Sequence, residues 1–162
     1  MTKEIILTLS GTQELISNGA YDEEVSQALG EATDDGIQVI AIGEYYEKKG
    51  THYILYDEVV EGQAVVDKNM IKIGPDKVEV TKKGGTSVQM LFEEGKKTMT
   101  NYHTPYGSIY MGVDVFSIEK RITDSLIEMQ IIYQLELNYE PVAMCALKLK
   151  VISKNDKNFT LQ

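Results

Sequence analysis

The string YHTPYG at residues 102–107 holds the histidine that is best placed to do chemistry in this sequence. His103 is one of only two histidines, and its imidazole could contact a ligand or act as a general base. Pro105 cannot donate a ladder hydrogen bond, so it favours a bulge, and bulges at barrel rims often aim a side chain into a site. A surface or packed histidine beside a structural kink is the alternative. Since Tyr102 and Thr104 share one strand face and His103 takes the other, only a bulge would let the string line a single pocket.

A second group of polar residues lies on one face of a predicted strand. Glu58 shares that face with His52 and Tyr56. An inward carboxylate in a barrel needs a partner, such as Lys82 or a tyrosine hydroxyl, and the pair could anchor a ligand head group. A solvated strand face is the alternative. Together the two groups give the predicted ligand-binding residues, which are Tyr56, Glu58, Lys82, Tyr102, His103 and Tyr106.

The sequence predicts no metal site, no cofactor and no catalytic nucleophile. His52 and His103 lack a ligand-like spacing, and Cys145 has no CxxC partner. Cys145 also falls on the apolar face of a predicted strand, where a small buried hydrophobe is expected. There is no GxSxG motif. The glycines at 84–85 belong to a hairpin turn, with no following helix whose N-terminus could hold phosphate.

Turn signals divide the chain into ten predicted strands. Gly, Pro, Asn and Asp recur at spacings typical of consecutive antiparallel strands. Between the turns, apolar and polar residues alternate, most regularly over 127–138 and again over 143–151. The predicted strands are residues 4–13, 37–49, 51–60, 63–73, 76–83, 86–93, 96–104, 107–122, 125–138 and 142–153.

These strands predict an all-β fold. A sheet of this size must curl or split, and closure removes exposed edges, so we expect an antiparallel up-and-down barrel of about eight to ten strands. One short helix is expected at residues 22–29, in the insertion after the first strand. Acidic residues crowd its first turn, and Gly30 can end it.

The composition favours one soluble globular domain. The chain has 162 residues, of which 43% are hydrophobic and 25% charged, which is enough to bury a core. We expect the barrel at residues 1–153 and a polar tail at 154–162. No signal peptide or membrane-spanning segment is evident. The single cysteine excludes an intrachain disulfide, so a cytoplasmic location is expected.

The net charge of −9 is concentrated at the start of the chain. Residues 1–47 hold one basic residue against ten acidic ones, and the remaining residues balance. With Arg121 as its only arginine, the chain lacks the phosphate-neutralising charge and guanidinium forks that nucleic-acid binding generally uses. The acidic segment could bind a basic protein partner, or it could be a solvated loop.

The order of these features resembles a bacterial family. A first strand is followed by an acidic insertion, a Tyr-x-Glu pair at 56–58, a turn at 82–84, the Tyr-x-Thr-Pro-x-Gly string at 102–107 and a long final hairpin. Over most of residues 4–152 the chain resembles the YwiB-like proteins, a domain-of-unknown-function family whose members are similar to lipocalins and other calycins. The family more often has Arg where this chain has Lys82. The resemblance implies a calycin-like barrel with a cavity, but no reaction, because a fold alone does not give a function.

Three functions follow as hypotheses. The first is non-catalytic binding of a small, partly apolar ligand inside the barrel, because alternate residues of eight to ten strands can line a cavity. The second is a protein-interaction module that uses the acidic N-terminal segment. The third is a small hydrolase or isomerase that uses His103 with Glu58 nearby. Apolar groups at Ile40, Ile42 and Tyr46 also leave a homodimer open.

Overall fold

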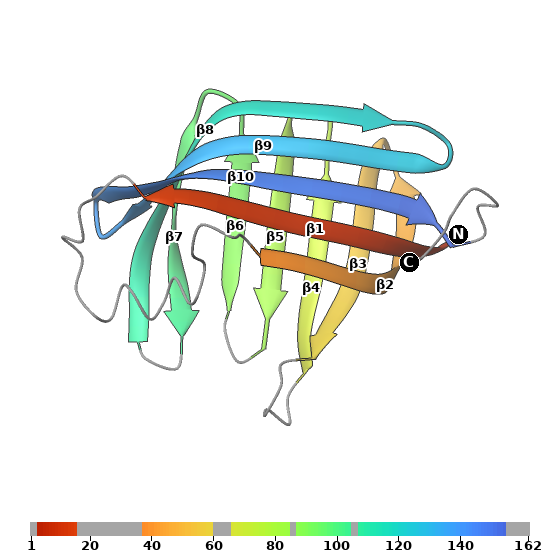
Figure 1. The fold of residues 1–162 in the computed structure, drawn as a ribbon, viewed down its shortest axis with the longest axis horizontal. Helices are drawn as coiled ribbons and strands as arrows, with labels where there is room; N and C mark the ends of the chain where they lie inside the picture. Colours follow the sequence, from red (N-terminus) through yellow and green to blue (C-terminus); the bar gives the residue numbers. More distant parts are fainter. Residues whose placement is uncertain (1–2, 16–36, 60–65, 85–86, 105–106, 155–162) are drawn as a thin grey trace.

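The computed structural model describes residues 3–15, 37–59, 66–84, 87–104 and 107–154, and these form ten antiparallel strands (Figure 1). The strands are β1 (Lys3–Leu15), β2 (Ile37–Lys48), β3 (Thr51–Val59), β4 (Val66–Ile73), β5 (Lys77–Lys83), β6 (Val88–Glu93), β7 (Lys97–Thr104), β8 (Gly107–Ile122), β9 (Leu126–Leu137) and β10 (Glu140–Ser153). The all-β, antiparallel prediction is confirmed. The helix predicted at 22–29 and the tail beyond residue 154 lie outside the described residues. Within these ranges no helix is long and apolar enough to cross a membrane.

The strands form one nearly closed barrel. Their order is β6-β5-β4-β3-β2-β1-β10-β9-β8-β7, so every neighbouring pair is consecutive in the chain except β1 and β10. The two ends of the sheet meet where Ser87 and His103 exchange two backbone hydrogen bonds of 3.0 Å. Near this seam the Thr98 hydroxyl donates to the carbonyl oxygen of Leu91 at 2.7 Å. The connections are therefore those of an up-and-down barrel.

Two strands turn corners and let the sheet fold over on itself. In Figure 1 the long strands β8, β9, β10 and β1 run across the shorter strands β3–β7 at a steep angle. In β2, Gly43 pairs with both Ile5 of β1 and Tyr56 of β3, and there the strand passes from one neighbour to the other. In β8 the register with β9 shifts between Val115 and Ser117. Bends and bulges of this kind are how strands switch between two packed layers.

The barrel interior is packed by side chains that alternate along each strand. Ile54, Ile71 and Phe92 are fully buried, and Cys145 is also buried. The ring of Phe92 meets that of Tyr133 edge-on, with 5.1 Å between ring centroids. Burial raises the pKa of Tyr133, so its phenol keeps its proton. The middle of the barrel is therefore an apolar core, and space for a ligand has to lie toward its ends.

The outer face of β2 carries exposed apolar side chains. Ile40 and Ile42 are 57% and 56% exposed. Farther along the strand, Tyr46 stacks on Tyr53 of β3 with 4.6 Å between ring centroids. These are the positions at which the sequence left a homodimer open, and that arrangement stays a prediction.

Candidate functional site

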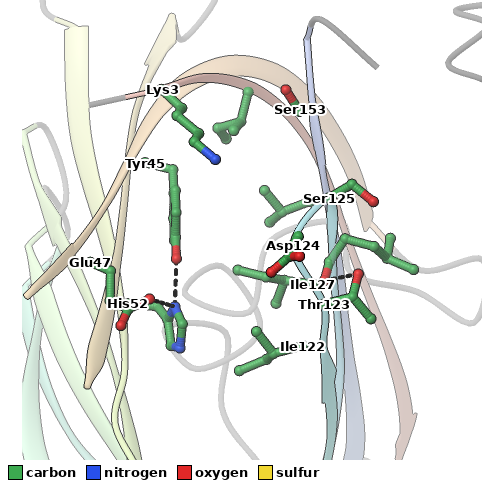
Figure 2. Close-up of a pocket in the computed structure, with 13 residues that line it drawn as sticks. Lys3, Tyr45, Glu47, His52, Ile122, Thr123, Asp124, Ser125, Ile127 and Ser153 are labelled. Atoms are coloured by element: carbon green, nitrogen blue, oxygen red, sulfur yellow. Dashed lines mark hydrogen bonds and ion pairs between the residues drawn. The ribbon is translucent and has the colours of Figure 1, made fainter. Parts of the chain in front are cut away.

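The described residues enclose a cleft of about 490 Å³ at one end of the barrel, which we call the end cleft (Figure 2). One wall is the β2–β3 hairpin, and the other is the β8–β9 hairpin with the starts and ends of β1, β9 and β10. Its lining residues are Lys3, Ile5, Tyr45, Glu47, His52, Ile122, Thr123, Asp124, Ser125, Leu126, Ile127, Val151 and Ser153.

The floor of the end cleft belongs to the barrel core. Ile5, Ile127 and Val151 are each at most 5% exposed and form part of the main apolar cluster. They come from three adjacent strands, β1, β9 and β10, and Val151 is the register partner of Ile127. Because inward positions alternate along each strand, these three side chains point to the same side of the sheet. The end cleft is thus a mouth of the barrel with an apolar base.

The first wall carries a paired tyrosine and histidine. The Tyr45 hydroxyl lies 2.7 Å from Nδ1 of His52, and the two rings stack with 5.8 Å between centroids and 17° between planes. Their strands are joined by a two-residue turn in which Lys49 and Gly50 both have positive φ, at 52° and 78°. Such a turn fixes the register of a hairpin, and it places Glu47 opposite His52.

The surroundings of this pair keep the Tyr45 phenol protonated and engage one of the two nitrogens of His52. Burial, and then the negative charge of Glu47, raise the pKa of Tyr45, so its phenol stays protonated at neutral pH. The Glu47 carboxylate is 3.9 Å from Nδ1 of His52. Both contacts are therefore made to Nδ1. Among the described residues these contacts engage Nδ1, so Nε2 is the imidazole nitrogen that can meet a ligand, as donor or acceptor according to the tautomer.

The second wall combines aliphatic and polar groups. The β8–β9 turn is closed by the Thr123 amide and hydroxyl, which donate to the carbonyl oxygen of Leu126 at 2.8 Å and 3.4 Å. Figure 2 shows Asp124 and Ile127 on this wall facing Tyr45 and His52, with the Lys3 ammonium entering from above. One lysine and two carboxylates, those of Glu47 and Asp124, therefore line the cleft.

Two of the residues predicted from the sequence, Tyr56 and Lys82, lie near the other end of β3. Tyr56 pairs with Asn69, and Asn69 pairs with Lys82, so the three lie side by side on the inner face. Lys82 lies 3.7 Å from the carboxylate of Asp67, which is 2% exposed. We call Tyr56, Asp67, Asn69 and Lys82 the inner polar cluster. Lys82 thus has an acidic partner on the inner face, Asp67. The predicted pairing of Lys82 with Glu58 stays a prediction.

The remaining predicted residues separate onto two faces. Tyr102 packs against the core, whereas His103 is exposed on the outer face and its Nδ1 lies 2.7 Å from the Ser108 hydroxyl. The Glu58 backbone pairs with Asp67. The Glu58 side chain and Tyr106 lie outside what the structure describes. None of the four predicted residues whose side chains are described, Tyr56, Lys82, Tyr102 and His103, lines the end cleft.

A second opening, the side groove, lies where β2 and β3 diverge. It has a volume of about 650 Å³ and is lined by Lys3, Glu4, Ile42, Gly43, Glu44, Leu55, Tyr56, Asp57, Lys68 and Asn69. Its walls mix inward and outward positions of the strands, since Tyr56 and Asn69 are buried while Asp57 and Lys68 are exposed. The groove therefore has no continuous apolar base. The end cleft is the better candidate for a ligand with an apolar part.

The sequence signals for the end cleft were weaker than those for the YHTPYG string. Tyr45, Glu47 and His52 lie within eight residues around Lys49-Gly50, so a hairpin at that dipeptide would have placed Glu47 opposite His52. The predicted strands 107–122 and 125–138 place Asp124 in a turn, but nothing local in the sequence puts its carboxylate across a cleft from Tyr45 and His52. Among the described residues, no group of three His, Cys, Asp or Glu side chains could hold a metal ion.

Comparisons with known proteins bear on the fold. The profile of a family described as "Domain of unknown function (DUF1934)" matches residues 23–149. The search of curated proteins gives no significant match. Among solved structures, the chain is similar to the crystal structure of the ywiB protein from Bacillus subtilis, with a TM-score of 0.74 and 16% identity over 95% of this chain and 94% of that one. The expected resemblance to YwiB-like proteins is confirmed, and at this identity the structural likeness concerns the fold.

Proposed function

Since the chain belongs to the DUF1934 family, whose function is unknown, we propose its function from the geometry of the site: it binds a small, partly apolar ligand in the end cleft without catalysing a reaction. The observation that carries the proposal is the cleft itself. A volume of about 490 Å³ falls within the usual range of small-molecule sites, roughly 300 to 1,000 Å³. An apolar base with a few polar groups at the rim is the usual composition of such sites.

The separation of apolar and polar groups within the cleft supports binding of a small ligand. Ile5, Ile127 and Val151 offer an apolar surface from which water can be displaced, which favours the apolar part of a ligand. Tyr45 and His52 are held by one another, so their polar atoms are preorganised and lose little freedom when a ligand arrives. A ligand with one apolar and one polar part satisfies both surfaces.

The finer description of the protein belongs to the same proposal. We place the barrel among calycin-like binding proteins because its strands follow an up-and-down order and its cleft opens at one end. We place the protein in the bacterial cytoplasm, in line with its resemblance to YwiB-like proteins and with the single, buried Cys145.

Native mass spectrometry of the protein isolated from its own host tests the proposal. We expect a fraction of the protein to carry a bound small molecule, and the extracted molecule to raise the melting temperature on re-addition. Ser125→Trp introduces a large ring at the exposed rim of the cleft and should abolish binding. Gln89→Trp, at an exposed position on β6 away from the cleft, is the control and should bind as the wild type does. The proposal is refuted if the wild type carries no small molecule, or if Ser125→Trp binds as well as the wild type.

A further inference from the structure

Building on the proposed binding function, we infer that the ligand of the end cleft contains a planar heteroaromatic ring with a neutral or positive charge. The inference comes from the shapes of the two walls and from the charges at the rim.

The first wall is aromatic and flat. The planes of the Tyr45 and His52 rings are within 17° of parallel, so the faces of the two rings have nearly the same orientation. In Figure 2 the Tyr45 ring is seen edge-on, and one of its faces looks across the cleft toward Ile127. The hydrogen bond between the Tyr45 hydroxyl and Nδ1 of His52 keeps both rings in this orientation.

The opposite wall is aliphatic. Ile122 and Ile127 project from the two strands of the β8–β9 hairpin, where they are register partners. A space bounded by aromatic faces on one side and branched aliphatic side chains on the other favours a flat ring, which can stack on the first wall while its second face contacts the isoleucines. A puckered ring or an open chain gains the apolar contact but not the stacking.

The charges at the rim select against an anion. The carboxylates of Glu47 and Asp124 outnumber the Lys3 ammonium in the cleft. An anionic ligand would meet this excess of negative charge, whereas a neutral or cationic ring would not. Nε2 of His52 and the hydroxyl of Ser125 can exchange hydrogen bonds with nitrogen atoms at the edge of the ring, so a heteroaromatic ring fits better than a hydrocarbon ring.

Binding of four small probes tests this inference. The probes are benzimidazole and adenine, which are flat heteroaromatic rings, 1-naphthoate, which is flat and anionic, and cyclohexylmethylamine, which is not flat. Saturation-transfer NMR and isothermal titration calorimetry at neutral pH would rank their affinities. We expect benzimidazole and adenine to bind best, with their affinity reduced about fivefold or more in Tyr45→Leu. Tyr53→Leu removes a tyrosine from the outer face of β3 and should leave their affinity unchanged.

The outcomes separate this inference from the proposed function. If cyclohexylmethylamine or 1-naphthoate binds as well as the flat heteroaromatic probes, or if Tyr45→Leu binds them as the wild type does, the inference about the ring is overturned while the cleft remains a binding site. If no probe binds and the protein from its host carries no small molecule, both the inference and the proposed function fail.

Discussion

Gly43 lies so close to Leu55 that a Cβ atom at position 43 would collide with the carbonyl oxygen of Leu55 and lie 3.2 Å from the Cβ of Tyr56. The contact falls where β2 leaves β1 and joins β3, at one of the two corners of the barrel. The strands can approach this closely only because residue 43 has no side chain.

Gly43→Ala should therefore destabilise the protein by about 2 kcal/mol or more, because the added methyl group meets rigid backbone. Gly11→Ala is the matched control. Gly11 also lies in the barrel wall, and the nearest atom to a Cβ there is 4.0 Å away, so the substitution should change stability little or raise it slightly. Urea unfolding of the two variants would measure the difference. Equal stabilities would contradict the role of the contact at the corner.

The contact between Lys82 and Asp67 in the inner polar cluster predicts that removing the Lys82 ammonium lowers the stability of the protein. Lys82→Met takes the ammonium group away from the buried carboxylate of Asp67, and we expect a loss of about 2 kcal/mol. This figure is below the usual cost of breaking a buried pair because Lys82 is 27% exposed and partly solvated. Lys83→Met changes the neighbouring, exposed lysine and should be close to neutral. A loss of the same size in both variants would rule out a specific contribution from Lys82.

Tyr139 is held in a backbone conformation that favours glycine. Its φ is 70°, and that of the preceding Asn138 is 51°, as the turn between β9 and β10 requires. A bulky side chain in this region is strained. Tyr139→Gly should be about 1 kcal/mol more stable than Tyr139→Ala, since both variants lose the ring contact with Tyr110 but only glycine relieves the strain. Thermal unfolding of the pair measures this, and a more stable alanine variant would show that the turn is unstrained.

Cys145 should make stability depend on alkaline pH. Burial raises the pKa of its thiol from 9.0 to about 11, while a hydrogen bond with Tyr133 acts in the opposite direction. The thiol therefore ionises first in the unfolded chain, so its contribution is present below about pH 9 and is lost as the pH rises through about 11. Between these values the wild type should lose about 2–3 kcal/mol more than Cys145→Ala.

Urea unfolding of both proteins at about pH 8 and about pH 10.5 would test this difference. The raised pKa of Tyr133 adds to the alkaline loss in both proteins because burial is its largest cause, and Cys145 raises that pKa further in the wild type alone. The difference between the two proteins therefore reports the thiol together with its effect on Tyr133. Parallel pH profiles would show that Cys145 ionises as readily in the folded state as in the unfolded chain.

The fold could be predicted because alternation in these strands is regular. From Ile127 to Leu137 every second side chain is apolar, and the structure buries those six side chains. Turn residues such as Gly50 and Gly95, both with positive φ, mark the hairpins that join consecutive strands. Local signals of this kind are sufficient for an up-and-down order, in which almost every pairing is between neighbours in the sequence.

The end cleft could not be predicted because its position depends on the corners. The β8 bulge falls at Val115–Ser117, where neither Gly nor Pro marks it, yet it sets the direction in which the β8–β9 hairpin carries Asp124. The contact between Tyr45 and His52 is diagonal, since the register partner of Tyr45 is Ile54. Such a contact depends on the local twist of the sheet, which the alternation of residues does not encode.

The YHTPYG string was a prominent sequence signal, and its histidine lies on the outside. His103 helps to close the barrel through its backbone, which pairs with Ser87, while its ring faces Ser108. The sequence does not distinguish this arrangement from a ligand contact, because both place a histidine beside a bend. His52, which lacks an unusual local sequence, is the histidine that faces a cleft.

The seam between β6 and β7 has a consequence for how the chain could be reconnected. Among the described residues, the one backbone pairing across this seam is the Ser87–His103 bridge, just before β6, whereas β1 and β10 are paired continuously from Ile5–Ser153 to Leu15–Ala143. The amide of Lys154 also donates to the carbonyl oxygen of Glu4 at 3.1 Å, so the two described ends of the chain lie side by side. A circular permutant opened at Gly95, with its original termini linked, would begin with β7 and end with β6. It would trace the whole wall in a single sequential meander, and its new ends would fall where the fewest pairings are lost.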